Sequence, residues 1–359
     1  MRKTVQQLKP YQPEEPLADL KKRLNLAKLV RLSANENPYG TSVHVNELFK
    51  TWSLNSDNRY PDGQATKLRQ AVSEFLSVAP NQLVFGCGLD EVISLINRTF
   101  LMENDAVLLS TPTFSEYQLN AQIEGAISID VPVKDDGHID FDGLIDAITP
   151  ATKLVWLCNP NNPTGTYESV ALIEQFMQQV PANILVVVDE AYIDYVTGVE
   201  NSSALQLQKQ FSNLVVLRTF SKAYGLANLR VGFGVFPLQL AQRMQAVRLP
   251  YNLNDVSQQA ALVALQDQAF IQRTVAKTVS ERRKWEAFLT NQKIPFFKSQ
   301  TNFIFINLQQ AKQVSKYLLQ NGYLVRDGLR PDWLRITIGE SADNLAVQNL
   351  LVKWINSAR

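Results

Sequence analysis

The 359-residue sequence is poor in the residues that build metal sites, disulfide frameworks and membrane spans. It has 2 histidines and 2 cysteines, with no CxxC pair and no HExxH motif, which argues against a zinc ribbon, a zinc hydrolase and a disulfide scaffold. No apolar run approaches the roughly 18 residues of a membrane span, and the N-terminus lacks the apolar core of a secretory signal. We therefore expect a cytoplasmic protein that binds no metal.

An excess of either charge is also missing. The 35 basic and 34 acidic residues leave a net charge of +1, so no overall field favours nucleic acid or a membrane surface. Small molecules and further copies of the chain are the expected partners. GxSxG and P-loop motifs are absent as well, and GCGLDE (86–91) departs from the dinucleotide fingerprint GxGxxG because Glu91 stands at its sixth position. A nicotinamide enzyme is poorly supported.

What the sequence does contain is a series of short apolar runs alternating with helical patterns. Such runs are typical of a mostly parallel sheet covered by helices on both faces, which is a three-layer α/β domain. A helical pattern from about 255 to 290 then precedes the order strand, helix, strand, strand, helix, which indicates a smaller α+β unit. We expect an extended arm (1–30), a large domain (31–246) and a small domain (247–359). The strand candidates of the large domain are residues 82–87, 106–111, 126–131, 153–158, 184–190, 213–220 and 231–236.

Polar residues follow several of these runs. NPNNPTG (159–165) comes after one, Asp189 and Tyr192 after another, and Lys222 after a third. Taken singly, Asp189 could be a helix N-cap, Lys222 a solvated loop residue and NPNNPTG a turn. Ligands bind beyond the carboxyl ends of parallel strands, and convergence at one edge favours a shared site over these separate explanations.

Two further features indicate what that site could bind. Gly86 and Gly88 precede a predicted helix and would free the amides of Leu89 and Asp90 to hold a phosphate, although a plain loop is an equal interpretation. With so few histidines and cysteines, a lysine is the natural nucleophile, since its amine forms Schiff bases with carbonyls such as that of pyridoxal 5′-phosphate (PLP).

Motifs spread over the chain resemble a known family. NPNNPTG, VVVDEAY, RTFSKAYGLANLRVGF and WLRITIG, in this order, resemble fold-type I PLP-dependent aminotransferases. LSANENPYG, NRYPDG, PYNLN and TNFIFI narrow the resemblance to the histidinol-phosphate aminotransferase branch, over roughly residues 8–355. The resemblance implies a homodimer with shared active sites. It also implies a reaction of histidine biosynthesis, in which L-histidinol phosphate and 2-oxoglutarate give imidazole acetol phosphate and L-glutamate.

The resemblance also implies which residues hold the PLP ring. Lys222 would bind PLP covalently and then shuttle a proton, because its freed amine is a base beside the reacting carbon. Asp189 would pair with the pyridine nitrogen, and Tyr192 and Asn162 would bind the ring oxygen. Phe114 would stack on the ring, where many relatives carry Tyr.

The resemblance likewise implies which residues bind the cofactor phosphate and the substrate. The cofactor phosphate would lie on Leu89, Asp90, Thr219, Ser221 and Arg230, with Tyr60 reaching it from the partner subunit. Arg335 and Arg326 would clamp the substrate phosphate or carboxylate, near Asn162, and Tyr11 would close over the substrate. From spacing alone, a salt bridge at a strand edge explains the two arginines equally well.

Other functions remain open at this level. An aromatic amino-acid aminotransferase and a threonine-phosphate decarboxylase share most of these motifs. A PLP-domain regulator without enzymatic activity is less favoured, because it would add a DNA-binding domain for which the N-terminus has no room and no basic patch. An α/β protein without cofactor is the remaining alternative.

Overall fold

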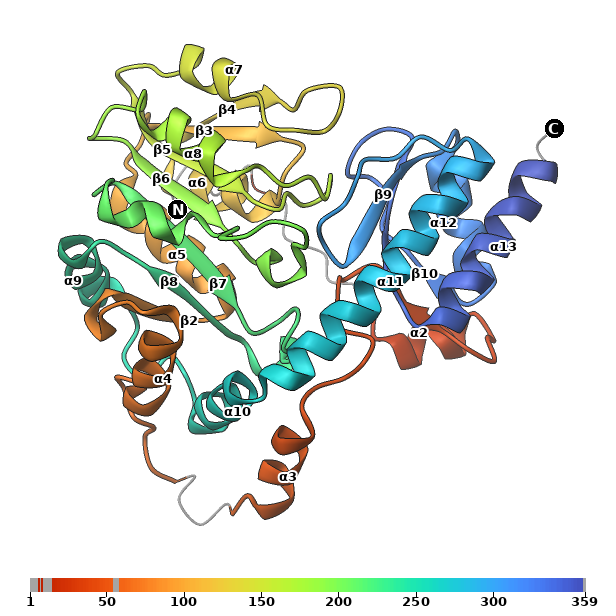
Figure 1. Cartoon of the computed structure of the whole chain (residues 1–359), viewed down its shortest axis with the longest axis horizontal. Helices are drawn as coiled ribbons and strands as arrows, with labels where there is room; N and C mark the ends of the chain where they lie inside the picture. Colours follow the sequence, from red (N-terminus) through yellow and green to blue (C-terminus); the bar gives the residue numbers. More distant parts are fainter. Residues whose placement is uncertain (1–5, 7, 9–14, 54–57, 358–359) are drawn as a thin grey trace.

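The computed structural model describes residues 6, 8, 15–53 and 58–357. Two lobes are visible, a large one around a seven-stranded sheet and a small one on two short sheets, with one long helix running between them (Figure 1). The strands of the large sheet are β2 (Leu83–Cys87), β3 (Ala106–Thr111), β4 (Ile127–Pro132), β5 (Thr152–Cys158), β6 (Leu185–Asp189), β7 (Leu214–Thr219) and β8 (Val231–Val235). All seven predicted strands are therefore present.

The large sheet has the order β2-β8-β7-β6-β5-β3-β4. Its strands are parallel except β8, which runs antiparallel to both β2 and β7. The reversal has a consequence for the site, because β8 begins at the edge where its neighbours end. Arg230, the residue before β8, thereby returns to the edge that Lys222 leaves. The predicted mostly parallel sheet is confirmed.

Helices cover both faces of this sheet, as expected for strands that are apolar along their whole length. Val187 on β6 belongs to a core cluster with α5 (Gly88–Phe100), whereas its neighbours Val186 and Val188 belong to a second cluster with α8 (Val170–Met177). The other helices of this lobe are α3 (Val43–Thr51), α4 (Thr66–Leu76), α6 (Ser115–Glu124), α7 (Phe141–Asp146), α9 (Leu238–Val247) and α10 (Asp255–Gln266). The three predicted layers are present.

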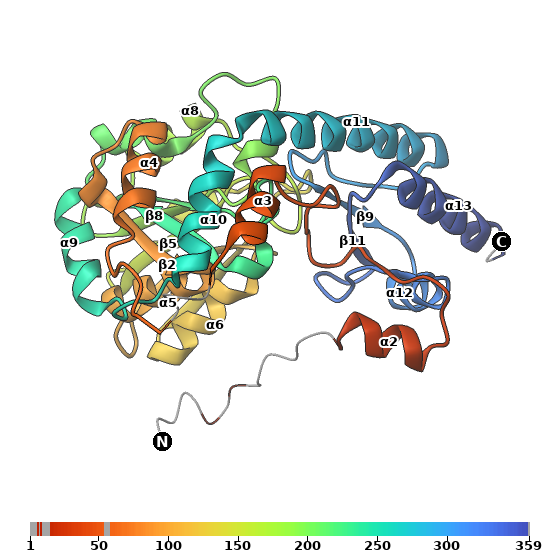
Figure 2. The same cartoon turned by 90° about the horizontal axis from the view of Figure 1, so that it is seen from below.

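The small lobe is built on two pairs of strands. β9 (Phe303–Asn307) and β11 (Trp333–Thr337) are antiparallel, while β1 (Val30–Arg31) and β10 (Tyr323–Leu324) are parallel. Their core packs against the helices α11 (Gln268–Gln292), α12 (Ala311–Gln320) and α13 (Ser341–Ser357). Figures 1 and 2 both place α2 (Leu17–Arg23) with this lobe, away from the large sheet.

Three local expectations were wrong. Residues 17–23 of the supposed extended arm form helix α2, whose Asp19 in the first turn and basic residues in the last turn suit the helix dipole. The pattern at 255–290 is two helices, because Asp267 leaves the helical conformation and its carboxylate accepts a hydrogen bond from the Phe270 N–H. The first of the two consecutive strands expected in the small unit, at YLVRDG (323–328), is limited to the two residues of β10.

Contacts between the lobes bear on the domain limits. β1 joins the small lobe through β10, and α10 packs on α3, α4 and β8 of the large one. The division into residues 1–30, 31–246 and 247–359 remains a prediction.

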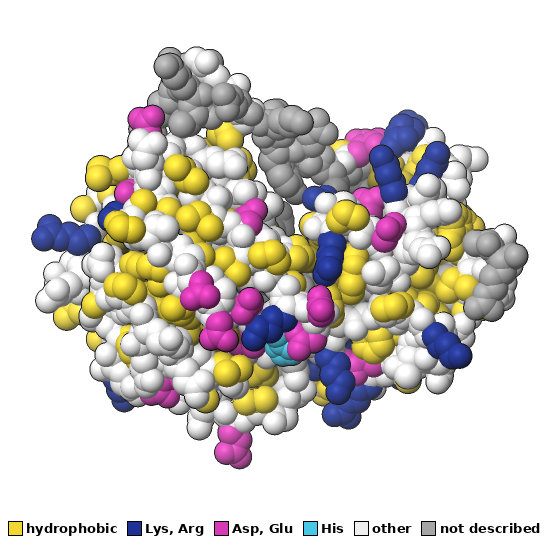
Figure 3. Space-filling model, turned by 90° about the horizontal axis from the view of Figure 1, so that it is seen from above, with side chains coloured by type: hydrophobic (Ala, Val, Ile, Leu, Met, Phe, Trp, Pro, Cys, Tyr) yellow, Lys and Arg dark blue, Asp and Glu magenta, His cyan; other side chains and the backbone are white. Residues whose placement is uncertain are grey.

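None of the described helices is long and apolar enough to cross a membrane. On the described part of the face shown in Figure 3, acidic and basic side chains are interspersed.

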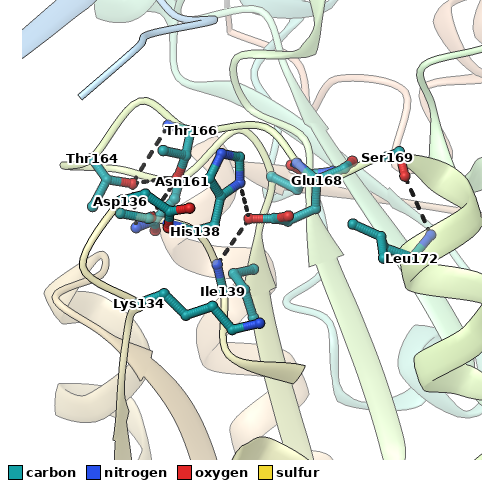
Figure 4. A network of polar contacts seen from close by, with 12 residues as sticks. Lys134, Asp136, His138, Ile139, Asn161, Thr164, Thr166, Glu168, Ser169 and Leu172 are labelled. Atoms are coloured by element: carbon teal, nitrogen blue, oxygen red, sulfur yellow. Dashed lines mark hydrogen bonds and ion pairs between the residues drawn. The ribbon is translucent and has the colours of Figure 1, made fainter. Parts of the chain in front are cut away.

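The NPNNPTG loop after β5 is fastened to a neighbouring turn by a polar network (Figure 4). The buried Glu168 carboxylate accepts the Ile139 N–H at 2.8 Å and contacts His138 Nδ1 at 2.9 Å. Asn159 exchanges hydrogen bonds with the Glu168 backbone in both directions, at 2.7 and 2.9 Å. Because these hydrogen bonds join the Glu168 carboxylate and backbone to both segments, the loop that presents Asn162 is held in one position.

We expect the His138–Glu168 pair to stabilise the fold only at lower pH. The hydrogen bond to Glu168 raises the pKa of His138, so the stabilisation is fully present below the ordinary value of about 6.5 and is lost as pH rises through the higher folded-state pKa. His138→Gln should lower the free energy of unfolding by at most about 1 kcal/mol near pH 6, since the imidazole is 42% exposed.

Urea unfolding near pH 6 and near pH 9 measures this effect. We expect the difference in free energy of unfolding between the native protein and His138→Gln to be smaller near pH 9. Lys50→Gln, which removes the exposed ion pair with Glu47, is the control and should show the same small difference at both. A His138→Gln effect independent of pH would contradict the prediction.

Candidate active site

A cavity lies at the edge where the parallel strands end and β8 begins. It has a volume of about 170 Å³ and shares Asp90, Phe114, Asn162, Tyr192 and Lys222 with an adjoining cavity of about 580 Å³. The smaller cavity is lined by Leu89, Asp90, Phe114, Tyr117, Cys158, Asn162, Asp189, Ala191, Tyr192, Thr219, Ser221, Lys222 and Arg230. The sheet topology thus gathers residues from six separate segments around one space.

Lys222 lies at the junction of the two cavities. It follows β7 and is half-buried, and its Nζ donates a hydrogen bond to the Ala34 carbonyl at 3.3 Å. The same Nζ is 5.5 Å from the centre of the buried Tyr192 ring. A lysine whose amine has a neutral carbonyl partner and borders both cavities is well placed to react with a carbonyl compound entering them.

Asp189 is the last residue of β6 and is only 3% exposed. Its Oδ2 accepts a hydrogen bond from the Tyr117 hydroxyl at 2.7 Å, and its Oδ1 accepts one from the Ala191 N–H at 3.0 Å. Burial raises the pKa of Asp189 to about 6, and the two hydrogen bonds oppose that rise. At neutral pH the cavity therefore contains a buried carboxylate whose two donors are uncharged, an arrangement that favours a cationic ligand group.

The N-terminus of α5 forms the opposite wall. Gly88 begins this helix with φ +76°, and a Cβ there would lie 2.1 Å from Arg230 Nη2, so only glycine lets the guanidinium lie over the helix end. Arg230 also has a positive φ of +53° and pairs with Asp90 at 2.9 Å. Unpaired first-turn N–H groups beside an arginine form a site for a dianion such as a phosphate.

Two hydroxyls complete this wall. Thr219 and Ser221 both line the small cavity, and the Ser221 N–H donates to Thr219 Oγ1 at 3.1 Å. Glu91, which breaks the dinucleotide fingerprint, accepts hydrogen bonds from the Cys87 N–H and from Asn252 Nδ2. The glutamate therefore caps the start of α5, which explains its presence where the fingerprint requires glycine.

The larger cavity has three arginines in its lining, Arg31, Arg326 and Arg335. Arg335 on β11 is buried and donates hydrogen bonds to Asn162 Oδ1 and to the Ser33 carbonyl. The lining therefore suits an anionic group of a ligand whose other end reaches Lys222.

Most of the predicted site residues that the structure describes meet here, with the exception of Tyr60. The other residues predicted to bind the cofactor ring and phosphate line the small cavity, and Arg326 and Arg335 line the larger one. Tyr60 is 83% exposed, stacks on Tyr251 at 4.7 Å between ring centres, and lies outside both linings. Tyr11 lies outside the described residues.

Sequence reasoning missed two residues at this site. Tyr117 stacks on Trp156 at 4.5 Å between ring centres and binds Asp189. Its position three residues after Phe114, in the first turn of α6, was an available signal. Asn35, which donates to the Tyr192 hydroxyl at 3.0 Å, carries no such signal, because the two residues are 157 positions apart.

Comparison with known proteins adds an independent line of evidence. A family model for aminotransferases of class I and II matches residues 27–348. A histidinol-phosphate aminotransferase from Lactiplantibacillus plantarum is 53% identical, over 98% of this chain and 99% of its own. Another from Limosilactobacillus fermentum is 49% identical, over 99% of each chain. The histidinol-phosphate aminotransferase of Sinorhizobium meliloti, solved in complex with pyridoxal-5′-phosphate, covers 100% of this chain and 98% of its own with a TM-score of 0.90 at 24% identity, which shows a shared fold.

We expect Tyr117→Phe to raise the pKa of Asp189 further. The substitution removes one of two hydrogen bonds to a buried carboxylate, and a bond of about 1–1.5 kcal/mol corresponds to an increase of about 1 in pKa. Carbon-13 NMR titration of the protein without cofactor, with Asp189→Asn identifying the resonance, measures the change. Tyr167→Phe is the control, since its hydroxyl donates to the Ser202 carbonyl instead. An unchanged Asp189 titration would contradict the prediction.

Proposed function

The chain belongs to the class I and II aminotransferase family, and on that premise we propose that it is a PLP-dependent transaminase acting on L-histidinol phosphate. The observation that carries the substrate assignment is the 53% identity over nearly full length to a histidinol-phosphate aminotransferase. In the proposed reaction the amino group passes from L-histidinol phosphate to 2-oxoglutarate, which gives imidazole acetol phosphate and L-glutamate in histidine biosynthesis.

The smaller cavity fits PLP at both ends. The buried Asp189 carboxylate has only uncharged donors and would pair with a protonated pyridine nitrogen. The N-terminus of α5, with Arg230, Thr219 and Ser221, would hold the phosphate. When bound, PLP supplies a cationic ring that accepts electrons from the substrate carbon.

The residues of the chain have separate tasks in this proposal. Lys222 would hold the cofactor through its carbonyl; once the substrate amine displaces it, the freed lysine amine would be the base that moves a proton from the substrate carbon to the cofactor carbon. Asp189, ionised above a pKa of about 6, keeps the ring nitrogen protonated. Tyr192 and Asn162 hold the ring oxygen, and Phe114 at the cavity wall covers the ring face.

The arginines of the larger cavity bind the substrate anion. Arg335 reaches Asn162, so the residue proposed to touch the substrate also touches a residue proposed to touch the cofactor. A guanidinium can bind a phosphate in one half-reaction and a carboxylate in the other, because both present two oxygens. Arg326 lines the same cavity and forms a backbone bridge with Arg335, which supports its role as the second arm.

We further propose a homodimer with shared sites in the cytoplasm. Tyr60 lines neither cavity of its own chain and lies on the surface with Leu249 and Tyr251, which are 61% and 49% exposed. An exposed aromatic and aliphatic group of this kind is typical of an interface. Across such an interface Tyr60 would reach the cofactor phosphate of the partner subunit. Both described cysteines are free thiols, which supports a reducing compartment.

We expect turnover with L-histidinol phosphate and 2-oxoglutarate to exceed turnover with phenylalanine or tyrosine by at least about 100-fold in kcat/KM. Phenylalanine and tyrosine would present only a singly charged carboxylate to the same arginines, whereas a phosphate dianion accepts more charged hydrogen bonds, each contributing about 1.5–3 kcal/mol. Coupled assays of glutamate formation measure this ratio, and carbon dioxide release is measured in parallel. Lys222→Ala should abolish turnover, whereas exposed Lys316→Ala should not. Equal rates for the aromatic amino acids would favour an aromatic aminotransferase, and carbon dioxide release without a keto acid would favour a decarboxylase.

We expect two inactive variants to restore activity when their subunits are mixed. Tyr60→Ala and Lys222→Ala would remove different halves of a shared site, so a mixed dimer keeps one intact site of its two. Random pairing makes half of the dimers mixed, and the activity returns to about a quarter of the native value. A mixture of Lys222→Ala with Arg335→Ala is the control and should stay inactive, since both residues serve the same cavity system. No recovery in the first mixture would rule out the shared site.

A further inference from the structure

Asn35, in the LSANENPYG stretch, has a position that the proposed reaction leaves unexplained. It is 1% exposed and lies between Tyr192 of the large lobe and Thr337 on β11 of the small lobe. Its φ of +55° is in the left-handed region, which asparagine tolerates better than most residues. All four of its polar groups form hydrogen bonds, the backbone carbonyl accepting from Asn302 Nδ2 at 3.0 Å.

Thr337 determines which way the Asn35 amide points. The Asn35 N–H donates to Thr337 Oγ1 at 3.0 Å, and Thr337 Oγ1 also lies 3.0 Å from Asn35 Oδ1. The threonine oxygen accepts from the backbone N–H and donates its own hydrogen to Asn35 Oδ1. The oxygen of the amide is thus committed to Thr337, and its nitrogen faces Tyr192.

This orientation decides the role of the Tyr192 hydroxyl. Asn35 Nδ2 donates to Tyr192 Oη at 3.0 Å. A phenol has one hydrogen to donate, and an oxygen that accepts from Asn35 keeps that hydrogen for another acceptor. Tyr192 lines both cavities, so an acceptor held there can receive it.

We propose that Asn35 is a positioning residue that makes Tyr192 a hydrogen-bond donor toward the cavity, with Thr337 setting the direction of the Asn35 amide. The inference rests on the proposed function, in which the acceptor is the ring oxygen of PLP. Arg335 and Thr337 lie on the same face of β11, and Arg335 also binds the Ser33 carbonyl. The strand that supplies the substrate-binding arginine therefore also sets the polarity of a hydrogen bond to the cofactor.

Binding of PLP to the protein without cofactor tests the inference. Thr337→Val keeps the shape of the side chain and removes the hydroxyl, so the Asn35 amide is free to turn its oxygen to Tyr192. Asn35→Asp puts an acceptor in place of the donor and draws the phenol hydrogen away from the cavity. We expect the Kd for PLP to rise about 3- to 10-fold for Thr337→Val and by more than about 10-fold for Asn35→Asp.

The same substitutions in a Tyr192→Phe background separate positioning from a structural role. If Asn35 and Thr337 act through the Tyr192 hydroxyl, Thr337→Val changes the Kd less than about twofold there. The added charge of Asn35→Asp acts in both backgrounds, so the inference requires its effect to be at least about tenfold larger with Tyr192 present. Thr274→Val, a buried threonine on α11 outside both cavity linings, is the matched control.

The outcomes distinguish this inference from the proposed function. Equal losses of affinity in the native and Tyr192→Phe backgrounds would overturn the role of Asn35 while leaving the transaminase intact. If the native protein binds no PLP and turns over no amino donor, the proposed function and this inference are both wrong. Should Asn35→Asp fail to fold, Thr337→Val and its double variant with Tyr192→Phe still decide the question.

Discussion

The buried carboxylate of Asp189 is the constraint on which the site depends. Placing a charge at the end of β6, under the sheet edge, carries a desolvation cost that Tyr117 and the Ala191 amide offset only in part. A ligand with a protonated nitrogen completes the balance. The aromatic stack of Tyr117 on Trp156 keeps the hydroxyl donor in place, so a packing interaction of the core controls an electrostatic property of the site.

The reversal of β8 provides the second requirement. A parallel strand in that place would begin at the opposite edge of the sheet, and Arg230 would then lie at the other end of the strands from Lys222. Because β8 is antiparallel to both neighbours, Arg230 meets the N-terminus of α5 at the edge where Lys222 lies. One cavity therefore has a carboxylate at one end and an anion site at the other.

The small lobe contributes more than the two arginines that we propose bind the substrate. β11 presents Arg335 to Asn162 and Thr337 to Asn35, and Asn35 in turn reaches Tyr192. Residues proposed to bind substrate and residues proposed to bind cofactor are thus joined by hydrogen bonds through one strand. The fastening of the NPNNPTG loop by Glu168 keeps Asn162 in place from the other side.

The seven strands, their layers and most of the residues lining the smaller cavity could be predicted from the sequence, because fully apolar strands and the polar residues that follow them are local patterns. The break at Asp267 was missed, since a single capping carboxylate interrupts a pattern that is apolar on both sides. Tyr117 and Asn35 were missed because their partners are distant in sequence. The sequence by itself determined the chemistry available at the sheet edge, the lysine, carboxylate, arginines and helix start. Only the tertiary structure decided the direction of each hydrogen bond and the pKa of Asp189, because both depend on burial and on donors brought together from separate elements.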